Sequence, residues 1–159
     1  MAAGIIELCD QVVSLIEAAW GPTGNDSVER LYTAPVSVSE LNTLVGRKVY
    51  VFPGRKLSIG AASRGEDRFN WSIGIVAVER CEDPGTPPIA WTDERVLWME
   101  GTVEAAVDFD ARDDHYMEFS GRTLWTLSIE TDIYDADKHD EDSMFWSTME
   151  VVFDEIAEA

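Results

Sequence analysis

Two runs typical of β-strands, 47–52 and 69–80, are separated by 16 residues, and this spacing constrains the fold more than any other feature of the sequence. The second run alternates, as a strand with one buried face does. Its apolar face consists of Trp71, Ile73, Ile75 and Ala77. An ordinary hairpin needs roughly 2–5 connecting residues, and long ordered loops commonly have a function. The sequence therefore predicts a basic hairpin arm at 53–68.

Positive charge is concentrated around this arm in a strongly acidic chain. The protein has 12 Lys and Arg against 31 Asp and Glu, a formal net charge of −19. Six cations and two acids fall between 47 and 68, which gives this window +4 and leaves −23 for the rest. A cationic arm on an anionic body is self-complementary, and head-to-tail contacts of this kind close into rings or continue as filaments. The charge pattern therefore predicts an assembly protein.

The arm supplies the candidate contact residues. We expect an interface with another subunit or a partner protein, formed by its cations and by the two aromatic residues at the start of the next strand: Arg55, Lys56, Arg64, Arg68, Phe69 and Trp71. Exposed aromatic side chains beside charges are typical of protein interfaces. The alternative for the same segment is a disordered, solvated loop that balances the charge of the body.

Length and composition predict one soluble domain. A chain of 159 residues with 45% hydrophobic residues, six Trp and six Phe can build a core, and it is not a disordered acidic tail. No apolar run approaches the roughly 20 residues that cross a bilayer, and the first residues lack the basic start of a signal peptide. Cys9 and Cys81 have no metal-binding spacing, so we expect buried, reduced thiols and a cytosolic origin.

The order of predicted elements indicates an α+β domain. Apolar residues at helical spacing predict a helix over 4–20, stopped by Gly21 and Pro22, and a second helix after Thr92 as N-cap. Within the second helix, Gly101 is expected to allow close packing of a strand. The remaining expected elements are strands at 28–33, 47–52, 69–80, 122–131 and 144–153, one helical turn at 39–44, and acidic connectors at 108–118 and 130–142.

These elements predict about four mainly antiparallel strands with two helices packed on one face. On strand 122–131, Leu127 and Ile129 are expected to share a face. On strand 144–153, the apolar face is expected to be Phe145, Met149, Val151 and Phe153, opposite Trp146, Thr148 and Glu150.

The sequence gives little support to catalysis or metal binding. His115 and His139 sit among carboxylates, but neither has a second histidine at a ligand spacing, so both are expected to be solvated loop residues. The segment from Asp135 imitates a calcium loop but lacks its glycine and has Trp146 at the twelfth position. Nucleotide-loop and nucleophile-elbow motifs do not occur. We therefore expect no enzyme, no catalytic residue, no cofactor and no metal.

The layout resembles the tail-terminator (tail-completion, or minor tail) proteins of long-tailed bacteriophages. Those chains open with a helix and a Leu/Gly segment leading into a strand that ends in Pro. A long basic loop containing Ser-Arg follows, then a strand, a helix and a closing aromatic-rich strand. The matching segments here are LNTLVGRKVYVFP at 41–53, ASRGEDRFNWSIGI at 62–75 and MFWSTMEVVF at 144–153. The extra acidity and the insert at 135–142 leave open whether the chain caps the tube or forms a neighbouring neck ring.

This resemblance implies a structural virion protein that assembles in the host cytoplasm. It implies a homohexameric ring on the last ring of tail tube protein, which stops tail growth and offers a docking face to the head–neck connector protein. DNA would pass through the lumen without specific binding, since a net charge of −19 does not favour wrapping nucleic acid. No membrane partner and no catalysis are implied.

Two other function classes remain open on the sequence. An acidic DNA mimic, with carboxylates at phosphate-like spacing, would inhibit a DNA-binding enzyme and would explain the charge outside the arm. It does not explain why six cations are concentrated in one hairpin. A small hydrolase based on carboxylates is the weaker alternative.

Overall fold

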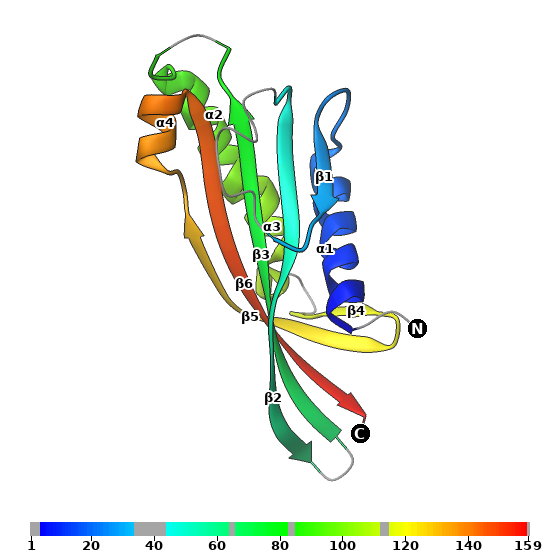
Figure 1. Cartoon of the computed structure of the whole chain (residues 1–159). Helices are drawn as coiled ribbons and strands as arrows, with labels where there is room; N and C mark the ends of the chain where they lie inside the picture. Colours follow the sequence, from blue (N-terminus) through cyan, green and yellow to red (C-terminus); the bar gives the residue numbers. More distant parts are fainter. Residues whose placement is uncertain (1–3, 34–43, 64–65, 83–84, 112–114, 159) are drawn as a thin grey trace.

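The computed structural model describes residues 4–33, 44–63, 66–82, 85–111 and 115–158. Within this part of the chain, six strands form one sheet in the order β1-β2-β3-β6-β5-β4 (Figure 1). The strands are β1 (Ser27–Arg30), β2 (Arg47–Ser63), β3 (Glu66–Arg80), β4 (Met117–Phe119), β5 (Arg122–Asp132) and β6 (Met144–Glu158). Only the β1–β2 pair is parallel among these strands. The mixed α/β class and antiparallel character are confirmed, but the expected number of about four strands is wrong.

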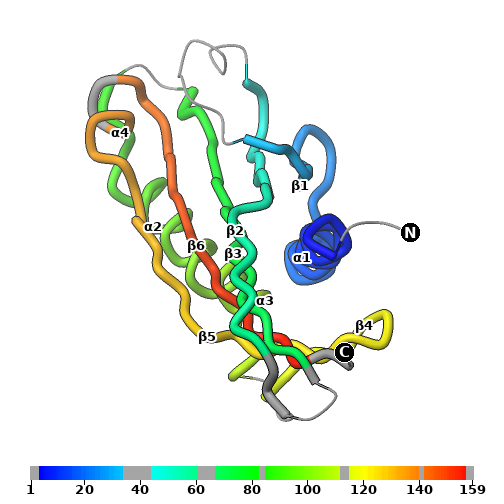
Figure 2. Tube along the Cα trace, turned by 60° about the horizontal axis from the view of Figure 1, so that its bottom comes forward, coloured from blue at the N-terminus to red at the C-terminus, as the bar shows by residue number. Residues whose placement is uncertain are grey.

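Two helical segments cover one face of the sheet, as predicted. The first is α1 (Gly4–Trp20), and Figure 2 shows it nearly along its axis, next to β1. The second consists of α2 (Ile89–Trp98), the π-helix η2 (Met99–Glu104) and α3 (Ala105–Val107). Buried residues of both segments and of the strands form a single core: Leu8, Val12 and Ile16 from α1, Met99 and Val103 from η2, and Val49, Ile73, Ile75, Phe145, Val151 and Phe153 from the sheet.

The other face of the sheet has a smaller apolar cluster at one end. It contains Tyr50, Val76, Val78, Met144 and Trp146, with partly buried residues such as Phe52 packed against it. Phe52 lies over Gly74, where a Cβ atom would come within 2.2 Å of the ring. Glycine is therefore required at this position so that the aromatic side chain can lie on the strand. The alternation predicted for β3 and β6 is confirmed by these two clusters.

The expected long loop at 53–68 is not a loop. β2 continues to Ser63 and β3 begins at Glu66, so both strands run through the segment. The register shifts at Pro53/Lys56, Ser58/Gly60 and Ala61/Ser63, which shows that bulges accommodate the Pro and Gly residues. Pro and Gly are ordinarily turn residues, but an edge strand tolerates them at bulges.

The second helix begins earlier than predicted. It starts at Ile89 after Pro88, and the Thr92 hydroxyl donates to the Pro88 carbonyl at 3.3 Å instead of capping the helix. The expected role of Gly101 is also wrong, since a Cβ atom there would meet nothing within 4 Å. Gly101 lies in the π-helical turn, where its exposed position has no packing requirement.

Further boundaries differ from the prediction. β1 ends at Arg30, and β6 runs to Glu158 instead of Phe153. The connectors hold short elements: the 3-10 turn η3 (Phe109–Ala111), β4 and α4 (Ala136–Asp142). Leu127 does not share a buried face with Ile129, because the register shifts between Thr126 and Ser128 and leaves Leu127 54% exposed. The helical turn expected at 39–44 falls largely outside the described residues.

Cys9 and Cys81 are buried and form no disulfide, as predicted. Burial raises the pKa of the Cys9 thiol to about 11, and the nearby Asp10 adds to this effect while Arg30 opposes it. Such a thiol stays protonated and unreactive at neutral pH. None of the helices in the described segments has both the length and the hydropathy needed to span a membrane.

Candidate interaction surface

A three-stranded extension of the sheet projects past the helices. It is formed by the second half of β2, the first half of β3 and the end of β6 (Figure 1). β1 pairs with β2 only from Lys48 to Val51, and the Leu31 N–H adds one bond to the Val51 carbonyl at 2.8 Å. Beyond Val51, no described strand covers the outer edge of β2. Leu57 and Ile59 on this edge are 55% and 48% exposed.

The structure places four of the six predicted contact residues on or near this extension's surface. Arg55 is exposed, and its backbone N–H donates to Ser72 Oγ at 2.8 Å. The exposed Lys56 ammonium lies 4.5 Å from the centre of the half-buried Phe69 ring. Arg68 forms two hydrogen bonds to the Asp154 carboxylate, at 2.9 and 3.0 Å. Among the predicted cations in the described residues, Arg55 is the one whose side chain forms no hydrogen bond, ion pair or cation–π contact.

The remaining two predicted contact residues are not found on this surface in the described part of the chain. Arg64 lies outside the described residues. Trp71 is only 6% exposed and its Nε1–H donates to Glu155 Oε1 at 2.8 Å, so this side chain supports the extension from the core. Gly4 of α1 packs against the Trp71 ring, since a Cβ atom at Gly4 would lie 3.2 Å from it.

The extension is not cationic as a unit. Its segment 53–68 has four cations and two acids, but β6 adds Asp154, Glu155 and Glu158, which brings the sum to −1. The other two cations of the basic window lie in the body: Arg47 bonds Glu79 at 2.6 Å, and Lys48 contacts the Asn25 carbonyl. The positive charge expected of the arm is therefore cancelled within the extension, because the acidic end of β6 pairs with the basic segment.

Glu155 and Arg122 hold the base of the extension together. Arg122 donates to Glu155 at 2.9 Å from Nε and at 2.7 Å from Nη2, and it also donates to the Gly4 carbonyl at 2.7 Å. The Glu155 side chain is 4% exposed and that of Arg122 is 12% exposed. The pair thereby links β5, β6, β3 and the start of α1.

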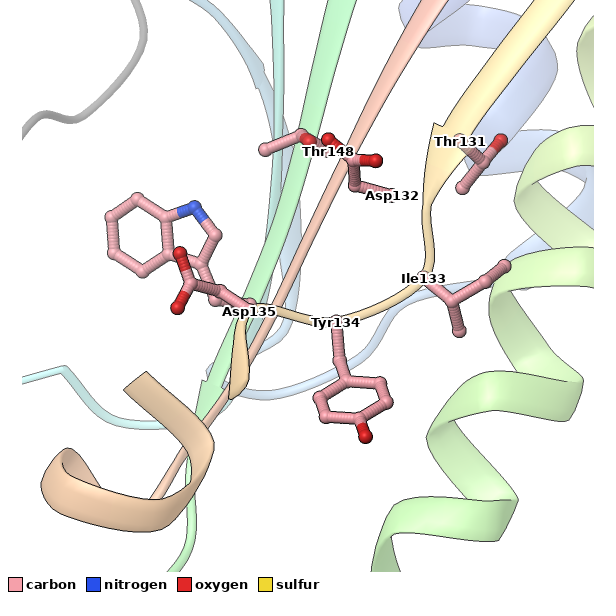
Figure 3. A pocket seen from close by; sticks show the side chains of 7 residues that line it. Thr131, Asp132, Ile133, Tyr134, Asp135 and Thr148 are labelled. Atoms are coloured by element: carbon pink, nitrogen blue, oxygen red, sulfur yellow. The ribbon is translucent and has the colours of Figure 1, made fainter. Parts of the chain in front are cut away.

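The face of the sheet opposite the helices carries unpaired acids. Glu130 of β5 lies directly opposite Glu150 of β6, and Asp132 lies opposite Thr148. In Figure 3 the side chains of Asp132 and Thr148 lie on the same side of the sheet, away from that of Thr131. A hollow of about 320 Å³ is bordered by Glu130, Asp132, Thr148 and Glu150, and Phe52 and Gly74 also line it. Within the described part of the chain, the three carboxylates of Glu130, Asp132 and Glu150 form no ion pair with Lys or Arg.

The facing glutamates make a prediction about stability. Like charges directly opposite on neighbouring strands are destabilising, by about 0.2–1 kcal/mol for a typical cross-strand pair. Glu150→Gln is therefore expected to raise the free energy of unfolding by that amount, measured by urea denaturation at neutral pH and low salt. The gain should shrink at high salt, because the repulsion is screened. Equal stability of the variant and the wild type at low salt would contradict this account of the acidic face.

One of the two histidines, His139, differs from the expectation of a solvated loop residue. His139 lies on α4, half-buried, with Nε2 2.8 Å from Thr92 Oγ1, and thereby links α4 to α2. His115 is exposed, as expected, with Nδ1 2.8 Å from the Asp110 carbonyl. A search of the described residues finds no group of His, Cys, Asp and Glu side chains that could hold a metal ion.

Comparison with protein-family models and with curated proteins gives no match to this chain.

Proposed function

We propose that this chain is a structural virion protein that forms a ring at the head-proximal end of a phage tail tube. The ring stops tail growth and joins the tail to the head. Its partners are further copies of itself, the tail tube protein and the head–neck connector protein, and its function involves no catalysis.

The observation that carries this proposal is the incomplete sheet edge. β2 beyond Val51 has no strand partner on its outer side in the described chain, and it exposes Leu57 and Ile59. An exposed strand edge with apolar side chains readily pairs with another chain. A monomer with such an edge is suited to assembly, and this favours a ring protein over a self-contained inhibitor or hydrolase.

The acidic face supports the same function in a second way. Glu130, Asp132 and Glu150 gather on the face opposite α1 and α2. If this face borders the lumen, its carboxylates repel phosphate and let DNA slide without binding. This face is our candidate for the lumen surface along which DNA passes without specific binding.

Deletion of the gene from its phage tests the proposal. We expect tails of abnormal and variable length, together with DNA-filled heads that carry no tail, because both termination and joining are lost. Electron microscopy of the lysate measures both, and expression of the wild-type chain in trans should restore normal particles. Full particles with tails of normal length from the deletion mutant would overturn the proposal.

The same acidic face favours one second candidate, the DNA mimic, because carboxylates at neighbouring sheet positions can imitate a phosphate row. This candidate predicts stoichiometric inhibition of a restriction nuclease by the purified chain. Inhibition that persists in Glu130→Gln/Asp132→Gln/Glu150→Gln would exclude this face as the mimic.

A further inference from the structure

The sheet has a second open edge, on β5. β4 pairs with β5 only from Arg122 to Leu124, so the outer side of β5 from Trp125 to Asp132 has no strand partner in the described chain. Leu127 bulges out on this edge and is 54% exposed. The molecule therefore has one unfinished edge on each side of the sheet.

The open parts of the two edges lie at the same level of the sheet. Across the strands, Phe52 is opposite Gly74, Gly74 is opposite Glu150, and Glu150 is opposite Glu130. Five residues further along β2, Leu57 pairs with Asn70 of β3, which pairs with Asp154 of β6. Asp154 in turn pairs with Trp125 of β5, so Leu57 and Trp125 lie at the same level of the sheet. A neighbour placed beside this copy without a vertical shift thus brings open edge against open edge.

The strand directions also match. The steps from β2 to β3, from β3 to β6 and from β6 to β5 are all antiparallel, so β5 runs opposite to β2. When copies are related by rotation about an axis along the strands, β2 of one copy lies antiparallel to β5 of the next. The antiparallel alternation of the sheet then continues from copy to copy.

The side chains on the two edges are complementary. Arg55 and Leu57 border a hollow on the face opposite the helices, together with Glu150 and Val152. Glu130 lies on that same face of β5 and is exposed. In a neighbouring copy placed without a vertical shift, Leu127 and Ser128 of β5 lie at the same height along the strands as Arg55 of β2. Glu130 is then the diagonal neighbour of Arg55, within reach of a long side chain. Each edge thus offers an exposed Leu, and the exposed charges of the two edges are of opposite sign.

We propose that the β2 edge of one copy docks antiparallel on the β5 edge of the next, with Arg55 facing Glu130 and Leu57 packing near Leu127. This inference rests on the self-association in the proposed function and names its interface. The contact is heterologous, since two different edges meet, and such contacts close into a ring when the rotation between copies closes and otherwise continue as a filament.

The irregularities of β2 restrict the choice of partner. Pro53 and the bulges that follow it interrupt the edge, and such features normally protect an edge against indiscriminate pairing. Backbone pairing at this edge is therefore short, and the charged and apolar side chains decide which edge is accepted. The contact should accordingly be sensitive to salt.

Charge exchange between two variants tests the proposal. Arg55→Glu alone and Glu130→Arg alone each place like charges at every contact, and each is expected to lose association. In a mixture, the altered β2 edge of the first variant meets the altered β5 edge of the second, and their normal edges also match. The mixture should therefore recover the wild-type oligomer, measured by native mass spectrometry at low salt. Loss without recovery, or wild-type association of either variant alone, would overturn the proposal.

Cysteine trapping keeps the test decisive if association is weak. Arg55→Cys protein mixed with Glu130→Cys protein, at high concentration with a short bis-maleimide, is expected to give mainly heterodimer. The matched control replaces Glu130→Cys with Ala18→Cys, an exposed position on α1. The natural Cys9 and Cys81 are buried and should not react. Equal yields from the test and control pairs would overturn the edge contact.

The two proposals fail in different ways. Normal particles from the gene deletion would refute the tail function and leave the edge contact to be judged by trapping. Rings in the mass spectrum without preferential trapping would refute the edge contact and leave the tail function intact.

Discussion

Glu155→Ala is expected to lower the free energy of unfolding by about 3–5 kcal/mol, the largest effect of any single change discussed for this chain. The substitution removes the acceptor of three hydrogen bonds, two from Arg122 and one from the Trp71 indole. It removes the short ion pair of the Arg122 guanidinium, which is 12% exposed, and leaves it only the Glu7 carboxylate, 3.8 Å away, as an ion-pair partner in the described residues. The measurement is urea denaturation followed by tryptophan fluorescence, compared with the wild type at neutral pH.

Glu150→Gln is the matched control for this prediction, because Glu150 lies on the same strand but is exposed and faces Glu130. It should not destabilise the protein. A loss below about 1 kcal/mol in Glu155→Ala would contradict the assignment of the Arg122–Glu155 pair as the support of the sheet extension. Loss of assembly in Glu155→Ala with retained folding would show that the extension also has to be correctly positioned.

Glu79→Gln is expected to cost about 1.5–3 kcal/mol, because it weakens charged hydrogen bonds at the opposite end of the sheet. Arg47 donates to Glu79 at 2.6 Å, and Arg95 donates to it at 2.8 and 3.2 Å. The Arg47 guanidinium also lies 4.5 Å from the Trp98 ring centre. This cluster ties α2 to β2 and β3.

The contribution of Glu79 should depend on pH in a defined direction. Burial opposes ionisation of Glu79, but the hydrogen bonds from Arg95 and Arg47 outweigh it and hold the pKa below its ordinary value of 4.5. A group with a lowered folded-state pKa stabilises the protein fully above its unfolded value and loses that contribution as the pH falls through the folded value. The stability difference between wild type and Glu79→Gln should therefore be constant near neutral pH and shrink below about pH 4.5. A difference that grows on acidification would contradict this assignment.

The periodicity of the sequence was enough to predict the buried faces of α1, β3 and β6, but not that of β5, where a register shift leaves Leu127 exposed. Steps of three and four from Ile5 to Ile16 place the stripe of α1, and alternation places Ile73 and Ile75 toward the helices. Both patterns record local geometry, which depends on neighbouring residues in the sequence.

The extension could not be predicted because it depends on pairing between distant strands. Pro53, Gly54 and Gly60 are turn residues by composition, and only their place on an edge strand with bulges makes them compatible with β2. The neutralisation of Arg68 by Asp154 likewise follows from the β3–β6 register, across 86 positions of sequence. The acidic face could not be predicted from the sequence for the same reason, since Glu130 and Glu150 meet only when β5 and β6 pair.

The central claim, that this chain sits as a ring at one end of a phage tail, is tested most directly by its location in the particle. Gold-labelled antibody against the chain, applied to purified tails and whole particles, should mark one position per tail, at the end that joins the head. In whole particles the same position should be masked or confined to the neck. Gold along the length of the tail, gold at the distal tip, or the complete absence of the chain from purified particles would contradict the account.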